Sequence, residues 1–379
     1  MTGFSFERAW AVLAKEFTQM RRDRITFAMM LVIPVMQLLL FGYAINSDPK
    51  HLPTAVLVED SSTLSRSVLQ AMKTSGYFDI TRQASSPAEL DRMMGRGDIQ
   101  FAVTIPADFS RRVIRHDDPQ ILVEADASDP VATGGAVAAL ATLPSTALAH
   151  DLTGPLAVIA GSSGAAPFQV VVHRRYNPEG LSSYNIVPGL LGIVLSMTLV
   201  MMTALGVTRE VERGTMESLL ATPVRPGEVM VGKLAPYVLV GLVQTAVILT
   251  LARGLFDVPM QGGWAALFTG VMLFIMGSLA LGFLISTVAG NQRQAMQLSF
   301  FYMLPSILLS GFMFPFRGMP GWAQVIGSCI PVTHFLRIVR GALLKGYGFS
   351  EMGPSLGALA LIVVAISTLA VLRYRRTLD

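Results

Sequence analysis

The chain alternates long apolar runs that contain no charged residue with shorter polar segments. The uncharged runs are Ile25–Ile45, Leu181–Thr208, Leu234–Ala252, Val258–Gln292, Gln294–Phe316 and Met352–Leu372. Each run reaches or nears the roughly 20 residues that a helix needs to cross the hydrocarbon of a bilayer. A charge at the centre of such a helix costs about 2.5–3.5 kcal/mol on insertion, so uncharged runs favour crossing. The pattern predicts an α-helical polytopic membrane protein with six transmembrane helices, one at 25–45 and five within 183–379.

Residues 46–182, between the first two predicted spans, alternate strand-like and helix-like segments. The strand patterns are TAVLVED (54–60), FDITRQ (78–83), QFAVTIP (100–106), QILVEAD (120–126) and FQVVVHRRYN (168–177). Helix patterns lie between them, and the first follows serines that can cap it. The nearly uncharged stretch Val131–Ala149 is rich in Ala, Gly and Thr, and we assign it to this domain as a helix. Because strand–helix alternation is typical of βαβ units, we expect an inserted α/β domain with a largely parallel sheet.

Two further segments depart from the pattern of spans. Residues 4–22 carry large apolar side chains three or four positions apart, so residues 1–24 are predicted to form an amphipathic helix at the membrane surface, with an ordinary charged leader as the alternative. Residues 318–346 are apolar but are interrupted by Pro320 and Pro331. A full crossing there would make the number of spans odd. We therefore expect two short re-entrant or interfacial helices that enter the outer leaflet without crossing.

The distribution of Lys and Arg predicts the orientation of the chain. With six spans, thirteen of these cations lie on the side of the two termini, and five lie in the short connections on the other side. Since cytoplasmic loops carry the excess of Lys and Arg, both termini are predicted to be cytoplasmic and residues 46–182 extracytoplasmic. The formal net charge of +4 then reflects membrane topology, and no nucleic acid partner is indicated. The single cysteine, Cys329, excludes an internal disulfide and a cysteine cluster for zinc.

The sequence shows no constellation that would support catalysis. Residues 227–233, GEVMVGK, match the spacing GxxxxGK, but Leu234 stands where a P-loop needs Ser or Thr, and no strand precedes the run. The five histidines have no metal-binding spacing. We therefore predict no catalytic residue, no bound cofactor and no metal. The predicted spans also lack the mid-membrane acids and bases that ion-coupled transporters usually carry, which indicates that energy enters from elsewhere.

Residues 209–226, REVERGTMESLLATPVRP, form a polar island between the second and third spans. Thr215 can cap a short helix, and Glu217 in its first turn favours the helix dipole. Met216, Leu219 and Leu220 fall on one face, and Pro223 ends the helix. The pattern predicts a two-turn amphipathic helix at 214–222 on the cytoplasmic side. It is either an interfacial connector or a knob for a soluble cytoplasmic partner.

Here the sequence resembles the type-2 ABC transporter permeases, in particular the bacterial drug-export-like subgroup with a large outer domain between the first two spans. The resemblance covers essentially the whole chain. It implies an ATPase-coupling role for a set of residues around the polar island: Glu210, Glu212, Arg213, Gly214, Thr215, Met216, Glu217, Leu219, Leu220, Pro223 and Lys233. After the fifth span a second set matches the family pattern and, with the two prolines, is assigned to an outer gate: Pro320, Trp322, Pro331, His334 and Arg340.

The resemblance implies a permease subunit of an ATP-driven exporter in a bacterial inner membrane. This subunit would form the translocation path as a homo- or heterodimer and would dock on a separate ATP-binding subunit that holds ATP and magnesium. A periplasmic adaptor is a further candidate partner. The chain itself would be no enzyme. Two other classes stay open at this stage, an ion-coupled secondary transporter and a membrane-anchored ligand sensor, and co-purification of a P-loop ATPase would separate the first reading from both.

Overall fold

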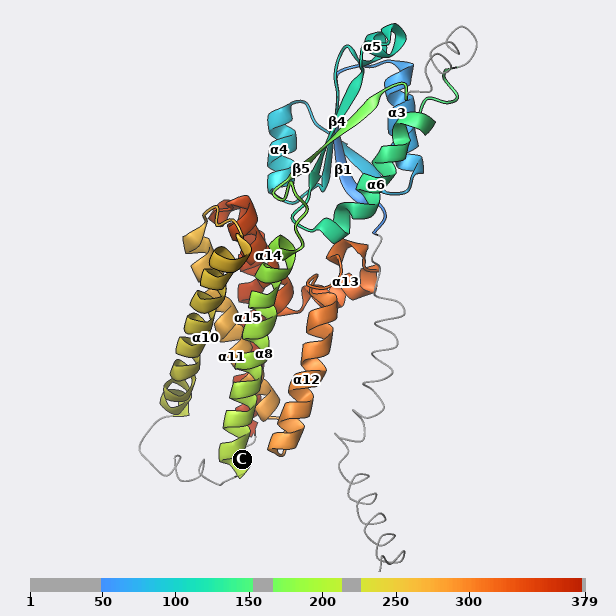
Figure 1. The fold of residues 1–379 in the computed structure, drawn as a ribbon. Coiled ribbons are helices and arrows are strands. Elements are labelled where there is room, and N and C mark those ends of the chain that lie inside the picture. The colour runs from blue at the N-terminus through green and yellow to red at the C-terminus, as the bar shows by residue number, and fades with distance from the viewer. Residues whose placement is uncertain (1–48, 153–165, 213–225, 377–379) are drawn as a thin grey trace, which may run out of the picture.

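The chain folds into an α/β domain and a bundle of long helices beneath it (Figure 1). The computed structural model describes residues 49–152, 166–212 and 226–376. Three predicted elements lie outside the described residues: the helix at 1–24, the span at 25–45 and the coupling helix at 214–222. The described parts contain all of the predicted strands and the five later predicted spans.

A five-stranded sheet with the strand order β2-β1-β3-β4-β5 forms the centre of the α/β domain. Its strands are β1 (Leu52–Val58), β2 (Phe78–Gln83), β3 (Phe101–Ile105), β4 (Gln120–Asp126) and β5 (Gln169–Arg175). The pairs β1–β2, β1–β3 and β4–β5 are parallel, whereas β3–β4 is antiparallel. The expected largely parallel sheet is confirmed, with one reversed pair that the alternation of strands and helices did not indicate.

Helices cover both faces of this sheet, as the apolar positions of its strands require. Buried side chains of α3, α5 and α6 share one cluster with the sheet, and those of α4 share another cluster on the opposite face. The Oγ of Ser62 accepts a hydrogen bond from the Ser65 amide at 3.2 Å, so the predicted serine cap is confirmed. The four helices are α3 (Thr63–Thr74), α4 (Pro87–Gly95), α5 (Phe109–Arg115) and α6 (Pro130–Thr146).

Four helices in the described part of the chain are long and apolar enough to cross a membrane. They correspond to predicted spans two, three, four and six. Their bounds are α8 (Ser183–Glu212), α10 (Pro226–Phe256), α11 (Trp264–Ser286) and α15 (Phe349–Arg376). The first predicted span lies outside the described residues, and the fifth differs from the other four.

The fifth predicted span, residues 294–316, forms a shorter helix than the sequence pattern indicates. Helix α12 covers Gln292–Leu309 and is not among the four candidate spans. Its first two turns carry glutamines and an arginine, which lower its hydropathy. The chain leaves the helix at Gly311, whose φ of +82° favours a residue without a side chain. The apolar residues that follow belong to a turn and to η3 (Phe316–Gly318) rather than to a longer helix.

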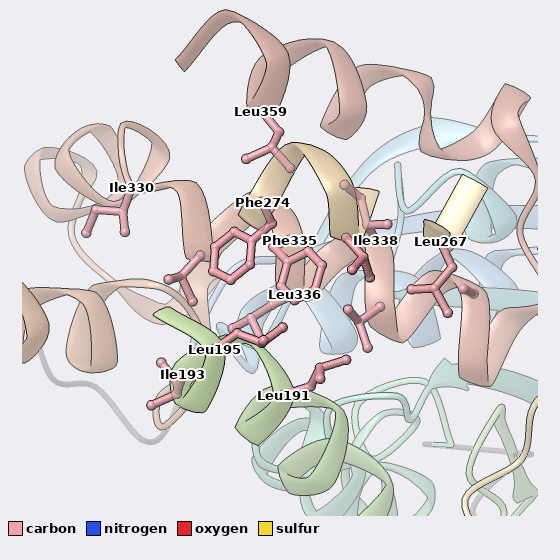
Figure 2. Packing of buried hydrophobic residues seen from close by; sticks show 14 of the residues in the cluster. Leu191, Ile193, Leu195, Leu267, Phe274, Ile330, Phe335, Leu336, Ile338 and Leu359 are labelled. Carbon is pink, nitrogen blue, oxygen red and sulfur yellow. The ribbon is translucent and has the colours of Figure 1, made fainter. Parts of the chain in front are cut away.

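Aromatic stacking marks the centre of the helical bundle. The rings of Phe274 on α11 and Phe335 on α14 (Pro331–Lys345) lie parallel with their centroids 4.1 Å apart, and both are fully buried. Figure 2 shows this pair surrounded by aliphatic side chains, including Leu195 of α8 and Leu359 of α15. Helix α14, although short, therefore packs at the core of the bundle and does not lie on its surface.

Close packing between α8 and α11 depends on small residues. The sequence places Ser278, Gly282 and Ser286 at four-residue spacing on α11, and all three are buried. A Cβ added at Gly282 would lie 2.6 Å from the carbonyl oxygen of Val200 on α8. Small residues of this kind let helix backbones approach closely in lipid, where packing rather than hydrophobic burial drives association.

Candidate coupling region and outer gate

At the start of the coupling region, the end of α8 forms a polar link with α12. The carboxylate of Glu212 accepts hydrogen bonds from the backbone N–H of Gln292 at 2.9 Å and from its side-chain Nε2 at 2.5 Å. The Nε of Arg209 donates to Oε1 of Gln292 at 3.4 Å. Since Gln292 is the first residue of α12, the carboxylate lies at the positive end of that helix dipole. The last turn of α8 is thereby tied to the first turn of α12.

Most of the predicted coupling residues lie outside the described part of the chain, namely Arg213, Gly214, Thr215, Met216, Glu217, Leu219, Leu220 and Pro223. Glu210 lies in the last turn of α8, and Lys233 lies within α10. Helix α10 begins at Pro226, so the GEVMVGK run is helical and does not form the loop with which a P-loop surrounds phosphates. The proposed coupling roles remain predictions.

The predicted outer-gate residues lie on two short helices that turn back on each other. Helix α13 covers Gly321–Ser328, and α14 follows after two residues. Pro320 precedes α13 and Pro331 opens α14, a position where a missing N–H costs nothing. The Oγ1 of Thr333 donates to the carbonyl of Gly327 at 2.6 Å. These contacts fix the reversal between the two helices.

The polar side chains of the predicted gate take different roles in the structure. His334 is buried, and its Nε2 lies 2.8 Å from the carbonyl oxygen of Ser328, so it ties α14 to the end of α13. Trp322 on α13 is 46% exposed and takes no part in that network. Arg340 donates from Nη1 to the carbonyl of Gly311 at 3.1 Å. The structure thus brings together His334 and Pro331 at one end of α14 and places Arg340 near its other end.

A seam between α14 and the α/β domain contains functional candidates that the sequence did not reveal. Lys345, the last residue of α14, forms a salt bridge with Asp126 at the end of β4, and both side chains are only 9% exposed. Asn185 at the start of α8 donates to Asp129 at 2.8 Å. Arg317 also donates to the carbonyl of Gly97 in the α/β domain. Lys345 and Asp126 are 219 positions apart in the sequence, so no local sequence pattern could have predicted their contact.

Asp129 is an acid of this seam whose pKa is shifted by its surroundings. Its carboxylate caps α6 by accepting from the Ala132 amide at 3.3 Å. Burial raises the pKa of Asp129 above its usual value, and this effect outweighs the attraction of Arg340 and the hydrogen bond from Ala132, which lower it. The seam therefore holds an acid whose charge is costly, facing an arginine of the predicted gate.

The two ends of the helical bundle make different contacts. Arg317 and Lys345, which the charge count places outside, touch the α/β domain. Glu212 and Gln292, placed inside, meet at the opposite end of α8, far from that domain in Figure 1. The described chain thus separates one end that carries the α/β domain from another that carries the polar link.

Comparison with known proteins decides the family. Residues 24–372 match the model of the family described as ABC-2 family transporter protein. The chain belongs to this family. It is 31% identical over 347 residues to the probable multidrug ABC transporter permease YbhS of Escherichia coli strain K12, with 90% of each chain covered. It is 25% identical to YbhR of the same strain, also named a probable multidrug ABC transporter permease, over 98% of this chain and 99% of that one.

A third relative is the inner membrane transport permease YhhJ of the same strain, which is 28% identical over 341 residues and is matched over 86% of each chain. These matches and the apolar helices show a membrane-spanning ABC transporter permease, as the resemblance read from the polar island indicated. An ABC-2 permease is a transport subunit, which accords with the prediction that the chain is not itself an enzyme.

Proposed function

We propose that this ABC-2 permease pairs with a second permease chain to form the translocation path of an ATP-driven exporter, and that residues 209–226 dock it on a separate ATP-binding subunit. The family match over residues 24–372 carries this proposal. The described structure supports it with the polar link between α8 and α12, which lies directly before the predicted coupling helix. Both termini are assigned to the cytoplasm of a bacterial cell, and the protein to its inner membrane.

Helix α8 offers a continuous helical path from the docking region to the outer gate. It has 30 residues, which corresponds to a length of about 45 Å at the usual rise per residue. Its last residue, Glu212, is bound to α12, and Asn185 in its first turn is bound to Asp129 of the α/β domain. Closure of the ATP-binding subunits would push on residues 213–225, and α8 would carry the displacement to the seam beside α14. Such an element couples two sites only if its two positions differ in free energy for each partner.

We further propose that the substrate is a hydrophobic or amphipathic molecule that leaves the cell. Two relatives named probable multidrug permeases support this substrate class. The four candidate spans of the described chain, which would line the path, are long and apolar.

Site-specific crosslinking tests the docking assignment. We would replace Cys329 by serine, introduce a cysteine at Thr222, and express the chain with candidate P-loop ATPases encoded in the same cell. A crosslink from position 222 to an ATPase, absent from a matched cysteine at Ser85 of the α/β domain, is expected. A chain that transports without any P-loop ATPase, driven by an ion gradient, would instead establish the secondary-transporter reading.

A further inference from the structure

A cavity of about 350 Å³ lies between the α/β domain and the outer end of the helical bundle. Its walls come from the loop after α4, the ends of β4 and α12, and helices α14 and α15. Its size falls within the range of small-molecule sites. Five cationic side chains and three carboxylates line it: Arg96, Arg317, Arg337, Arg340, Lys345, Asp126, Asp129 and Glu351.

The carboxylates of this cavity already have donors. Asp126 accepts from Lys345 and from the amide of Ser128 at 3.1 Å. Asp129 accepts from Asn185 and caps α6. The oxygens of Glu351 accept from the Gly348 amide at 2.9 Å and from the neighbouring serine hydroxyl at 2.6 Å. Among the described residues these carboxylates accept hydrogen bonds from groups other than the guanidinium groups of the cavity, while Asp126 and Asp129 attract Arg340 only through space.

The guanidinium group of Arg340, in contrast, has N–H donors without a hydrogen-bond partner among the described residues. Arg340 uses Nη1 on the carbonyl of Gly311, while its Nε and Nη2 are buried and have no hydrogen-bond partner among the described residues. The hydroxyl of Ser310, which also lines the cavity, is buried without a partner in the same part of the chain. A buried donor without a partner destabilises the folded protein, and does so more strongly when it is charged. The part of the chain that the structure describes offers no acceptor to these donors.

The remaining arginines add positive charge, although Asp126 and Asp98 attract Arg317 through space. Arg317 donates to the carbonyl of Gly97, which carries no net charge. The guanidinium of Arg337 lies over the ring of Phe316 at 4.8 Å, and it is close enough to Arg317 for the two to repel each other. An anion between them would relieve this repulsion and would meet the free donors of Arg340 as well.

We propose that this cavity is a binding site for a phosphate group, held by Arg340, Arg317 and Arg337 with the hydroxyl of Ser310. The planar guanidinium of Arg340 presents Nε and Nη2 side by side, a geometry that matches two oxygens of a phosphate. The group belongs either to a phospholipid headgroup that enters from the outer leaflet or to a soluble phosphate ester. The site joins the α/β domain to α14, so an occupied cavity stabilises the seam. This assignment does not depend on how the chain couples to ATP.

Two binding measurements on the full-length protein separate these sources. In the first, ³¹P NMR follows inorganic phosphate and glycerol phosphate added to protein in phosphatidylcholine nanodiscs. In the second, native mass spectrometry counts lipids retained by protein taken from mixed phosphatidylcholine and phosphatidylglycerol nanodiscs. Saturable binding of the soluble compounds identifies a phosphate-ester site. Retention of phosphatidylglycerol that glycerol phosphate does not displace identifies a headgroup site, and either result supports the proposal.

Variants assign the binding to this cavity. Arg340→Gln is expected to weaken binding at least tenfold, and Arg340→Lys to lose most of it, since a lysine keeps the charge but not the paired donors. Because Arg340 also holds Gly311, Arg337→Gln and Ser310→Ala serve as second variants, each with a several-fold loss. The matched control is Arg111→Gln on the exposed surface of α5, which removes the same charge far from the cavity. The proposal is overturned if no compound binds saturably, so that the cavity holds only water, or if Arg111→Gln weakens binding as much as Arg340→Gln.

Discussion

Removing one partner of the salt bridge between Lys345 and Asp126 should open the seam between the α/β domain and the bundle. Both side chains are 9% exposed, so Asp126→Ala leaves the ammonium of Lys345 buried without its counter-charge. Breaking such a buried pair costs about 3–5 kcal/mol. The rings of Tyr176 and Tyr347 lie 4.8 and 5.5 Å from the Lys345 Nζ and offset part of this cost. We therefore expect Asp126→Ala to lower the free energy of opening this seam by about 3 kcal/mol.

Hydrogen–deuterium exchange of the last turn of α14 measures this opening directly, because exchange there reports the free energy of local opening. A loss of 3 kcal/mol raises the exchange rate on the order of a hundredfold, at about 1.4 kcal/mol for each factor of ten. The matched control is Asp108→Ala, which breaks the exposed pair with Arg112 in the same domain. That pair should be worth no more than about 1 kcal/mol.

The double variant completes the test. Asp126→Ala with Lys345→Ala removes both charges, so it should cost less than the sum of the two single changes. Additive costs, or an effect of Asp126→Ala no larger than that of Asp108→Ala, would show that the pair contributes nothing specific to the seam.

Three further predictions concern stability and orientation. The folded protein holds the proton of Asp129 more tightly than the unfolded chain, so this residue lowers stability as pH rises above the reference value of 3.8. Asp129→Asn, which keeps a good helix cap, should raise the thermal midpoint at pH 7 but not at pH 3; an equal shift at both would contradict the charge argument. Gly282→Val should cost about 1–3 kcal/mol or more through overpacking, whereas Gly357→Val, with open space around its Cβ, should be tolerated. A cysteine at Ser85 should react with an impermeant label added outside the cell and one at Thr222 should not; the reverse result would invert the topology.

Much of the α/β domain was predictable because its signals are local. The segment FDITRQ is bounded by turn residues and forms β2 over the predicted residues, and Ser62 caps α3 as expected. The antiparallel pairing of β3 with β4 was not predictable, because the alternation of strands and helices does not specify the direction in which β4 runs beside β3 after α5. The local sequence pattern indicates which segments are strands, whereas their order and direction in the sheet depend on tertiary packing.

For the long helices and the seam as well, local features could be predicted from the sequence and tertiary contacts could not. Charge-free runs indicated the four candidate spans, but the run at 294–316 continues past the point where Gly311 turns the chain, so hydropathy alone overestimated that helix. The segment 318–346 was expected to form two short helices, and α13 and α14 occupy it. That Lys345 meets Asp126 could not be read from the sequence, since each is an ordinary charged residue at the end of its own element.

The docking of residues 209–226 on an ATP-binding subunit is tested most directly by Leu219→Ala together with Leu220→Ala. If these side chains fill a groove on the ATPase, truncating them removes buried apolar anchors, each of which commonly contributes 2 kcal/mol or more. The affinity for the ATPase, measured by titration on the purified permease in nanodiscs, should fall at least tenfold, while membrane insertion and the folding of the α/β domain are unchanged. A double variant that binds the ATPase with full affinity and still exports would show that residues 209–226 only connect two spans.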